Sequence, residues 1–567
     1  YQPVDTTKQA VKGGIYENFA ASAPQGFDPY RGDNITFMHT AHAYQRLLSY
    51  KQGTPDSPAD ASVEGDAAAS WEVSPDKLTL TFKLRQNSKW DSRPPTSSRV
   101  MTTDDIKFSW ERISSTSVGN GRELVNKLNP AAPILDMTFP DKNTIVVKLK
   151  EPVSAILGIL GYSWYFTIIP MESGDKYDMR NEMRGSGPWM LTAYETGTRF
   201  EYKRNPNYWK TDRPFLDGIN YPVITEPAQQ LAQFKAKRLW GGSGVVLGGG
   251  YQPSADNVIP TKKENPEALM RAISAFVGQG SKNDLVPSKL ETPSNPFQDV
   301  RVRYAMSLLI DRDTMTDVFS NKAGFAKEGI DLETAWHSHF PVSWGASGVW
   351  LDPKAGKLGD ASKYWKFDPA EAAKLMKAAG KYPIETEYTF SGTLPFGSPP
   401  YKQSNQVLIE QLQQGGHFKF TKINTPDHFS VYDPKYLFGH GQYEGISPEP
   451  FGGWPDPDMG IFAIYMPGGR NDYVYKPVPK AHDLALAHRK EFDRNKRLDI
   501  VHDWQKAMAV EMPTVPVPFI GTGYGTFSFH WPWLSNVGGV MGAITNGQEA
   551  DTLQHYWYDK SKDTRTS

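Results

Sequence analysis

The sequence predicts an α/β protein folded as more than one domain. At 567 residues the chain exceeds the size at which a single hydrophobic core stops growing, so at least two lobes are expected. The first half is rich in segments where apolar and polar residues alternate, as they do in strands. The second half is richer in apolar residues at helical spacing, bounded by helix start and stop signals.

The strand signals of the first half begin with a hairpin. Residues 78–84 alternate between apolar and polar side chains, and they follow a Ser-Pro-Asp turn and a strand at 70–73. The same alternation predicts strands at 144–150 and 198–203. A helix is expected over 103–112, with Thr103 as its N-cap and two aspartates in its first turn.

An uncharged run at 152–171 is long enough to raise the question of a membrane span. Gly158, Gly161 and Pro170 interrupt the run. We therefore predict a short buried helix followed by an apolar strand, and no transmembrane segment in the chain. A Gly- and Pro-rich passage at 241–265 is expected to be a loop.

The strongest helix signals of the second half lie at 368–379. Asp368 is expected to be the N-cap, and Glu371 is expected to complete a capping box with it. Pro369 suits the first helical position, and Gly380 stands where a left-handed residue often ends a helix.

Two further helices are expected at 300–310 and 493–508. Asp311 or Asp313 would cap the helix that follows the first of them. A strand at 514–520 would follow the second, because the segment is apolar and punctuated by prolines.

Charge and cysteine content exclude several classes of function. The 62 basic and 63 acidic residues leave a formal charge of -1, so no global field would attract nucleic acid or an anionic membrane. The chain has no cysteine, which excludes disulfides, thiolate catalysis, zinc-thiolate sites and iron–sulfur clusters. Because the charges nearly balance, a neutral or zwitterionic partner is expected.

Common catalytic motifs are missing from the sequence. There is no P-loop and no G-x-S-x-G, and the glycines at 241–250 lack the G-x-G-x-x-G spacing. The histidine pairs His39/His42 and His337/His339 lack an identifiable third metal ligand. We predict no catalytic residue, no cofactor and no metal site.

Asp456 and Asp458 lie two residues apart in a Trp- and Pro-containing segment. Two hypotheses for this pair are a calcium-binding loop and the two carboxylates of a glycosidase. The segment does not match a calcium-binding loop, because Gly460 stands at the third ligand position and Ile461 stands where the turn glycine is required. A glycosidase carboxylate pair suits two residues of one loop poorly, because the acid and the nucleophile usually come from separate elements. An exported hydrolase that uses these two residues is the least favoured of the functional hypotheses.

Motifs in a fixed order over nearly the whole chain carry a family resemblance. They are G-G-I at 13–15, F-D-P at 27–29, S-W-E-V-S at 70–74, L-T-L-T-F-K-L at 78–84, D-D-I-K-F-S-W-E-R at 104–112, G-S-G-P-W at 185–189, R-N-P-N-Y-W at 204–209, D-V-R-V-R-Y-A at 299–305, F-D-P at 367–369 and W-P-D-P-D at 454–458. Together they resemble the family 5 extracellular solute-binding proteins of ABC importers, which include oligopeptide-, dipeptide- and nickel-binding proteins.

This resemblance implies an α/β fold of the large, cluster C-like periplasmic-binding-protein type, with two lobes joined by two hinge strands. The implied division is an N-terminal linker at 1–12, lobe I at 13–273 with an inserted subdomain at about 50–185, lobe II at 274–525, and a return to lobe I at 526–567. The hinge crossings are expected near 273–280 and 521–529.

The implied function is capture of a peptide-like ligand between the lobes by hinge closure, followed by delivery to the permease subunits of an ABC importer. We expect a monomer in the periplasm or at the cell surface, with a lipid anchor as one way of attachment. Oligosaccharide binding is the alternative, because aromatic faces stack on sugars. ATP hydrolysis would belong to another subunit.

Seven residues are candidates for ligand contact on the strength of the resemblance. Asp456 is the first candidate to pair with a peptide's α-ammonium, and Asp458 either shares that role or holds the loop. The other candidates are aromatic or basic: Trp454, Phe37, Tyr165, Tyr401 and Lys402. Lys402 would replace the arginine that some dipeptide binders use for the ligand carboxylate, and the 454–458 tract is shorter than in those binders.

Overall fold

A computed structural model describes most of the chain and divides it into two compact units. The described residues are 1–30, 34–57, 59–115, 121–241, 255–273, 282–332, 334–345, 347–380, 383–393, 399–452, 454–474, 478–518, 526–539 and 549–565. Unit 1 comprises 1–250, 260–272 and 527–567, and unit 2 comprises 251–259 and 273–526. The predicted hinge crossings lie largely outside the described residues, so the predicted lobe limits stay predictions.

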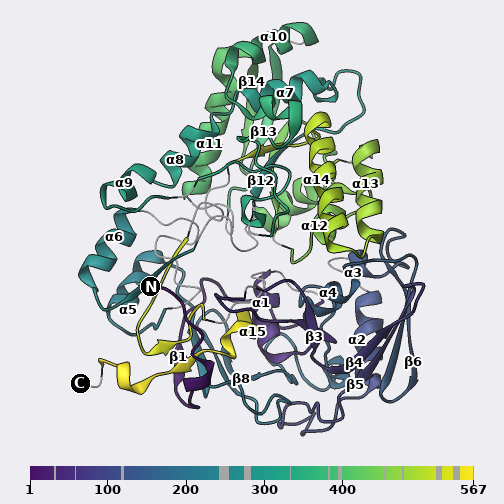
Figure 1. The fold of residues 1–567 in the computed structure, drawn as a ribbon, viewed down its shortest axis with the longest axis vertical. Helices are drawn as coiled ribbons and strands as arrows, with labels where there is room; N and C mark the ends of the chain where they lie inside the picture. Colours follow the sequence, from purple (N-terminus) through teal and green to yellow (C-terminus); the bar gives the residue numbers. More distant parts are fainter. Residues whose placement is uncertain are drawn as a thin grey trace. The chain divides into compact units, whose positions relative to one another are not determined.

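Unit 1 contains two four-stranded sheets (Figure 1). The order of the first is β1-β10-β9-β8, formed by Ile15–Glu17, Gly218–Pro222, Arg199–Arg204 and Trp189–Glu195. The order of the second is β4-β5-β7-β6, formed by Ala68–Val73, Thr79–Leu84, Thr144–Leu149 and Ile134–Asp141. Shorter pairs are β2 with β3, β11 with β17 and β18 with β19, formed by Leu48–Tyr50, Val63–Gly65, Leu269–Ile273, Thr526–His530, Leu534–Ser535 and Trp557–Tyr558.

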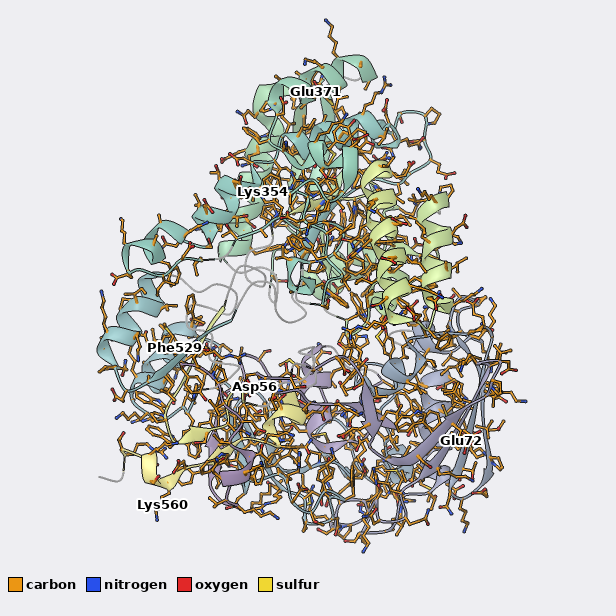
Figure 2. All side chains as sticks on the ribbon, viewed as in Figure 1. Asp56, Glu72, Lys354, Glu371, Phe529 and Lys560 are labelled. Atoms are coloured by element: carbon orange, nitrogen blue, oxygen red, sulfur yellow. The ribbon has the colours of Figure 1, made fainter. Side chains whose placement is uncertain are left out.

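The predicted hairpin is confirmed in the second sheet. β4 and β5 are antiparallel, with Val73 opposite Leu80. Leu80, Phe82 and Leu84 are buried on one face of β5, as their alternation requires. The exposed Glu72 of β4 points to the other face (Figure 2). The predicted strands at 144–150 and 198–203 form as β7 and β9.

The helices of unit 1 are mostly short. They are η1 at Thr7–Gln9, α1 at Asn34–Ala43, α2 at Thr103–Ser114, α3 at Gly121–Leu124, α4 at Ile156–Gly161, η2 at Met171–Gly174, α5 at Pro227–Lys235, α15 at Glu549–Leu553 and η8 at Lys560–Lys562; α6, at Ala255–Glu264, spans a division between the units. The first twelve residues, predicted to be a linker, contact unit 1: the Tyr1 amino group donates to Met270 O at 2.9 Å.

Two local predictions need correction here. The cap of α2 is Thr102 rather than Thr103, and it forms a capping box with Asp105. Helix α6 lies within the passage predicted to be a loop, because Val258 and Thr261, three residues apart, give the segment a buried face. The glycines at 242–250 lie outside the described residues.

The uncharged segment at 152–171 contains the predicted short helix, α4, but not the predicted strand. Residues 166–170 are buried without joining a sheet: Ile168 N donates to Gln45 O at 2.9 Å, and Ile169 N donates to Ser109 Oγ at 3.0 Å. A loop and a helix therefore satisfy backbone groups that a neighbouring strand would otherwise pair. Among the described residues, no helix combines the length and the apolar character needed to cross a bilayer.

Unit 2 is built on one five-stranded mixed sheet of order β14-β13-β15-β12-β16. Its strands are β12 at Lys282–Pro287, β13 at Ile384–Thr389, β14 at Phe418–Asn424, β15 at Ile446–Phe451 and β16 at Val515–Val517. β13 runs parallel to β14 and β15, whereas β12 is antiparallel to β15 and β16. The hydrophobic core of the unit includes Leu285 and Ile446 of the sheet and buried residues of α7 and α10.

Helices make up much of the rest of unit 2 (Figure 1). They are η3 at Pro296–Gln298, α7 at Val300–Leu308, α8 at Arg312–Phe319, α9 at Lys322–Lys327, η4 at Val342–Trp344, η5 at Gly359–Trp365, α10 at Pro369–Ala379, α11 at Pro399–Gln413, η6 at Gln414–Gly416, η7 at His428–Leu437, α12 at Pro457–Tyr465, α13 at Pro479–Lys490 and α14 at Arg494–Glu511. The predicted helices at 300–310, 368–379 and 493–508 are confirmed as α7, α10 and α14.

The caps of these helices largely follow the sequence. Asp311 caps α8, and Asp368 caps α10, which ends at Gly380 with a φ of 66°. Only one half of the capping box predicted for α10 forms. Glu371 N donates to Asp368 Oδ1, but Asp368 N donates to Leu308 O and not to the Glu371 side chain. The Glu371 side chain projects from the surface (Figure 2) and accepts from Lys374 Nζ at 3.0 Å, one turn along the helix.

Candidate functional site

Five of the seven predicted ligand-contact residues lie in unit 2. Trp454 and Asp456 lie in the segment between β15 and α12, and Asp458 lies in the first turn of α12. Tyr401 and Lys402 lie in the first turn of α11. Phe37 and Tyr165 belong to unit 1.

Asp456 is the N-cap of α12, and a neighbouring helix already supplies it with a positive charge. Its Oδ1 accepts from Asp458 N at 2.9 Å and from Arg497 Nη2 of α14 at 2.6 Å. Burial alone would raise the pKa of Asp456, but the ion pair and the hydrogen bonds outweigh it and hold the pKa below its ordinary value. Asp456 is therefore an ionised group whose charge is neutralised within the chain.

Asp458 is more completely enclosed. Its side chain is 0% exposed, and Arg489 of α13 contacts both carboxylate oxygens, with Nη2 to Oδ2 at 2.9 Å and Nε to Oδ1 at 3.1 Å. A bidentate arginine satisfies a carboxylate in both charge and geometry. The two aspartates thus tie the start of α12 to α13 and α14.

Trp454 and Tyr401 are buried, whereas Lys402 is exposed. The Trp454 ring packs over Gly452, where an added Cβ would lie 3.4 Å from the ring carbons. The Tyr401 ring lies 6.1 Å from that of Phe390, and burial raises the pKa of Tyr401 well above its ordinary value.

Phe37 and Tyr165 both pack inside unit 1. The Phe37 ring lies 4.4 Å from the Trp164 ring, and the Tyr165 hydroxyl donates to Glu123 Oε2 at 2.8 Å. In the described structure these two side chains contribute to packing in their own unit.

The two histidine pairs are also buried. Burial lowers the pKa of His39 to about 3 and that of His42 to about 4, and it lowers the pKa values of His337 and His339 to about 3. All four imidazoles are therefore neutral near pH 7. Within the described ranges, no group of three or more His, Asp or Glu side chains has the geometry of a metal site.

The sequence analysis missed a buried acid in β15, Glu449. Its side chain is 0% exposed, and neither carboxylate oxygen meets a hydrogen-bond donor in bonding geometry among the described residues. Burial raises the pKa of Glu449 to about 8, against a smaller lowering by the nearby Ser447 and Tyr432 hydroxyls. An acidic residue between two prolines in an apolar stretch was the available signal.

The prolines on either side of Glu449 explain how this strand is built. In the antiparallel pair of β15 and β12, Glu449 lies opposite Asp284, and the backbone groups of Pro448 and Pro450 face away from β12. Proline has no N–H to leave unpaired there. The two proline carbonyls accept from the hydroxyls of Tyr432, at 2.7 Å, and Tyr473, at 2.8 Å.

The alternation of β15 and β12 separates two kinds of residue. Leu285 and Ile446 face the hydrophobic core, whereas Glu449 and Asp284 occupy the opposite face of the sheet. On that face Asp284 pairs with Lys282 and accepts from Tyr465 Oη at 2.6 Å and Thr514 Oγ1 at 2.8 Å. This face therefore carries a buried polar cluster, of which Glu449 is one member.

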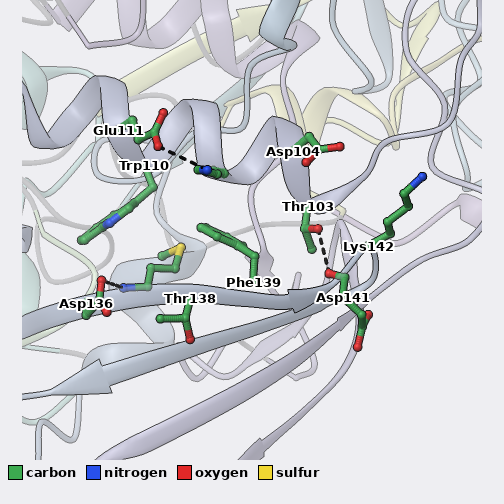
Figure 3. Close-up of a pocket in the computed structure, with 11 residues that line it drawn as sticks. Thr103, Asp104, Trp110, Glu111, Asp136, Thr138, Phe139, Asp141 and Lys142 are labelled. Atoms are coloured by element: carbon green, nitrogen blue, oxygen red, sulfur yellow. Dashed lines mark hydrogen bonds and ion pairs between the residues drawn. The ribbon is translucent and has the colours of Figure 1, made fainter.

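A surface groove in unit 1 is lined by none of the seven residues predicted to contact the ligand. It has a volume of about 650 Å³ and runs between α2 and β6 (Figure 3). Trp110 and Phe139 form its apolar part, and Thr103 Oγ1 donates to Asp141 O at 2.8 Å at one end. Its charged side chains are of both signs and include the Lys107–Glu111 pair, so the groove does not single out a ligand of either charge.

Comparison with known proteins identifies the family. Residues 62–472, more than half of the chain, match the family described as "Bacterial extracellular solute-binding proteins, family 5 Middle". The chain belongs to this family. The resemblance inferred from the motifs is therefore confirmed.

Full-length relatives and solved structures agree with the assignment. The dipeptide-binding protein of Escherichia coli (strain K12) is 22% identical over 88% of this chain and 89% of its own. The periplasmic binding protein DppA from Helicobacter pylori, solved with the peptide STSA, has a TM-score of 0.70 at 18% identity and covers 98% of this chain and 99% of its own.

The binding protein AgaA from A.tumefacien R10, solved with agropinic acid, has a TM-score of 0.71 at 18% identity and covers 96% of this chain and 99% of its own. These similarities confirm the predicted α/β fold of the periplasmic-binding-protein type. This family 5 protein is thus a solute-binding protein, and its relatives are named as binding proteins rather than enzymes.

Proposed function

We propose that this family 5 protein captures a peptide-like solute outside the cytoplasm and delivers it to the permease subunits of an ABC importer. The observation that carries the proposal is similarity over nearly the whole chain to a dipeptide-binding protein and to a peptide-bound ABC transporter-associated protein. We propose a periplasmic or cell-surface location, a monomeric state and no catalytic role.

Capture would follow from closure of the two lobes on their hinge, as the family resemblance implies. Enclosing a polar solute removes water from around it, and each polar contact strengthens as the local dielectric falls. The closed form would then be the one that the permease recognises. No step of this cycle requires a nucleotide or a cofactor in this chain.

We propose that Asp456 and Asp458 hold the ligand-contacting segment in place rather than meet the ligand themselves. Each carboxylate already pairs with an arginine of a neighbouring helix, Arg497 or Arg489. A second cation would have to compete with that arginine. The aspartates would thereby fix Trp454, which is the proposed apolar contact for the solute.

Lys402, exposed in the first turn of α11, is the proposed partner of a ligand carboxylate. Tyr401, and Phe37 and Tyr165 of unit 1, remain further proposed contacts.

A thermal-shift screen tests the proposed solute class. Purified protein is heated with di-, tri- and tetrapeptides, with oligosaccharides, and with an opine such as agropinic acid. A solute present at ~100 times its Kd should add about 2.7 kcal/mol to the free energy of unfolding. Stabilisation by peptides alone supports the proposal, and stabilisation by another class alone contradicts it.

A non-peptide solute is the second candidate. The structure solved with agropinic acid is as similar to this chain as the structure solved with a peptide, with TM-scores of 0.71 and 0.70. The opine and oligosaccharide arms of the same screen decide between the two classes.

A further inference from the structure

Residues 1–7 pack on the two strands by which the chain leaves unit 1 and returns to it. β11 ends at the division between the units, with Ala272 in unit 1 and Ile273 in unit 2, and β17 begins at the return, with Thr526 in unit 2 and Phe527 in unit 1. The two strands pair with each other in a two-stranded sheet. Closure on a hinge would therefore turn the chain at or next to this pair of strands.

The first residue contacts both of these strands. Tyr1 N donates to Met270 O of β11 at 2.9 Å, and the Tyr1 ring lies edge-on to the His530 ring of β17, with centroids 5.0 Å apart. The start of the chain is accordingly drawn beside β17 (Figure 1). A two-stranded sheet is only marginally stable by itself, so a segment that contacts both strands opposes their separation.

Further contacts attach this segment to unit 1. Thr6 N donates to Asn536 Oδ1 at 2.8 Å, and Trp557 Nε1 donates to Thr6 Oγ1 at 2.9 Å. The Val4 carbonyl packs so closely on Gly539 that a Cβ there would lie 2.2 Å from Val4 O. Polar contacts and close backbone packing therefore hold the segment, while the Val4 side chain itself is exposed.

The surroundings of His530 suit only its neutral form. The side chain is 0% exposed, and neither ring nitrogen has a hydrogen-bond partner among the described residues. The charged groups that face it are the Arg271 guanidinium of β11 and the Tyr1 amino group, and both are positive. Burial and these two cations lower the pKa of His530 to about 3. Protonation would therefore add a third positive charge beneath the Tyr1 ring.

We propose that residues 1–7 form a strap that holds β11 and β17 together, and that acid releases the strap by protonating His530. A buried neutral imidazole favours the seated strap above its ordinary pKa of about 6.5 and favours it less and less as pH falls below that value. The effect on capture rests on the proposed function. With both strands held, closure on a solute orders fewer residues, so release of the strap would weaken binding.

Hydrogen–deuterium exchange measured by mass spectrometry tests the strap without any solute. The full chain is compared with Tyr1→Ala/Thr6→Ala at pH 8 and pH 5, after correction for the intrinsic exchange rate. In wild type, protection of Thr6 N–H and of 269–273 and 526–530 should fall by up to about 30-fold at pH 5, which lies about 1.5 pH units below the ordinary histidine pKa. The double variant should already exchange fast at pH 8.

Two further variants separate the strap from a general loss of structure. Lys8→Ala/Val11→Ala changes two exposed side chains that follow the strap and should exchange like wild type at both pH values. His530→Gln stays neutral and should keep its slow exchange at pH 5. Unchanged exchange of the two strands in Tyr1→Ala/Thr6→Ala, or equal acid sensitivity of wild type and His530→Gln, overturns the inference.

Calorimetry with trialanine distinguishes this inference from the proposed function. If trialanine binds, the change from pH 8 to pH 5 should weaken its binding to wild type more than its binding to His530→Gln. Equal weakening would overturn the link between the strap and capture. If wild type binds no peptide, the proposed function fails, whereas the exchange measurements still decide whether the strap exists and responds to acid.

Discussion

At the residue scale, the buried acids of unit 2 differ in whether they form an ion pair. Asp458 and Asp284 form ion pairs with Arg489 and Lys282, whereas Glu449 is enclosed without an ion pair to a lysine or arginine among the described residues. A buried ion pair is costly to break because the remaining charge is left uncompensated. A lone buried carboxyl group instead avoids that cost by keeping its proton. The two arrangements predict opposite effects of neutralising the acid.

Neutralising Glu449 should stabilise the protein at neutral and higher pH. The folded-state pKa of about 8 lies above the ordinary value, so unfolding releases a proton between those two values. Over that window the contribution of Glu449 to the free energy of unfolding falls by about 1.4 kcal/mol per pH unit as pH rises. Its stabilising contribution is complete only below the unfolded-state pKa.

Urea unfolding of wild type and Glu449→Gln at pH 5, 6, 7 and 8 checks this. The difference between the two proteins should grow with pH in favour of the variant. Asp433 and His428 also titrate near Glu449, but they are present in both proteins and largely cancel in the difference. A difference that is flat with pH would refute the assignment of an unpaired Glu449.

Neutralising Asp458 should have the opposite effect. Asp458→Asn leaves Arg489 buried without its partner and should cost about 3–5 kcal/mol in the free energy of unfolding. The exposed pair Asp503 and Lys506 provides the control, because Asp503→Asn should cost less than about 1 kcal/mol. Chemical denaturation measures both, and equal costs would contradict the ion-pair account of the α12 start.

At the element scale, the sequence predicts helices well where both ends carry signals. Asp368 and Gly380 limit α10 as expected, because a cap and a left-handed glycine act through the local backbone. The strand expected after α4 does not form, because a strand needs a partner that only tertiary structure supplies. For the same reason β15 could not be recognised as the strand that carries Glu449.

The caps of α10 allow a direct test at this scale. Asp368→Ala should lower the free energy of unfolding by about 1 kcal/mol, because Glu371 N loses its acceptor at 2.9 Å. Glu371→Ala should cost about 0.5 kcal/mol or less, since its side chain pairs with Lys374 at the surface and not with the cap. Equal losses in thermal unfolding would restore the capping box.

At the scale of the whole molecule, the order of the motifs along the chain was enough to predict the fold and the family. Solved structures that share only 18% of residues have TM-scores of 0.70 and 0.71, so few positions need to be kept for this fold. The candidate site was less predictable. Asp456 and Asp458 look alike in the sequence as acids available to a ligand, and only the folded chain shows that Arg497 and Arg489 reach them.

Which solute a protein of this fold binds is set by a few side chains rather than by the fold. A peptide and an opine each occupy a protein of the same architecture and similar size. The overall similarity of the chain therefore does not give the charge of its solute.

Small-angle X-ray scattering of the protein with and without its best solute from the thermal-shift screen tests capture by closure most directly. Closure of two lobes predicts a smaller radius of gyration and a shorter maximum dimension when the solute saturates the protein. An identical scattering profile in both states, at a solute concentration that calorimetry shows to be saturating, would contradict it.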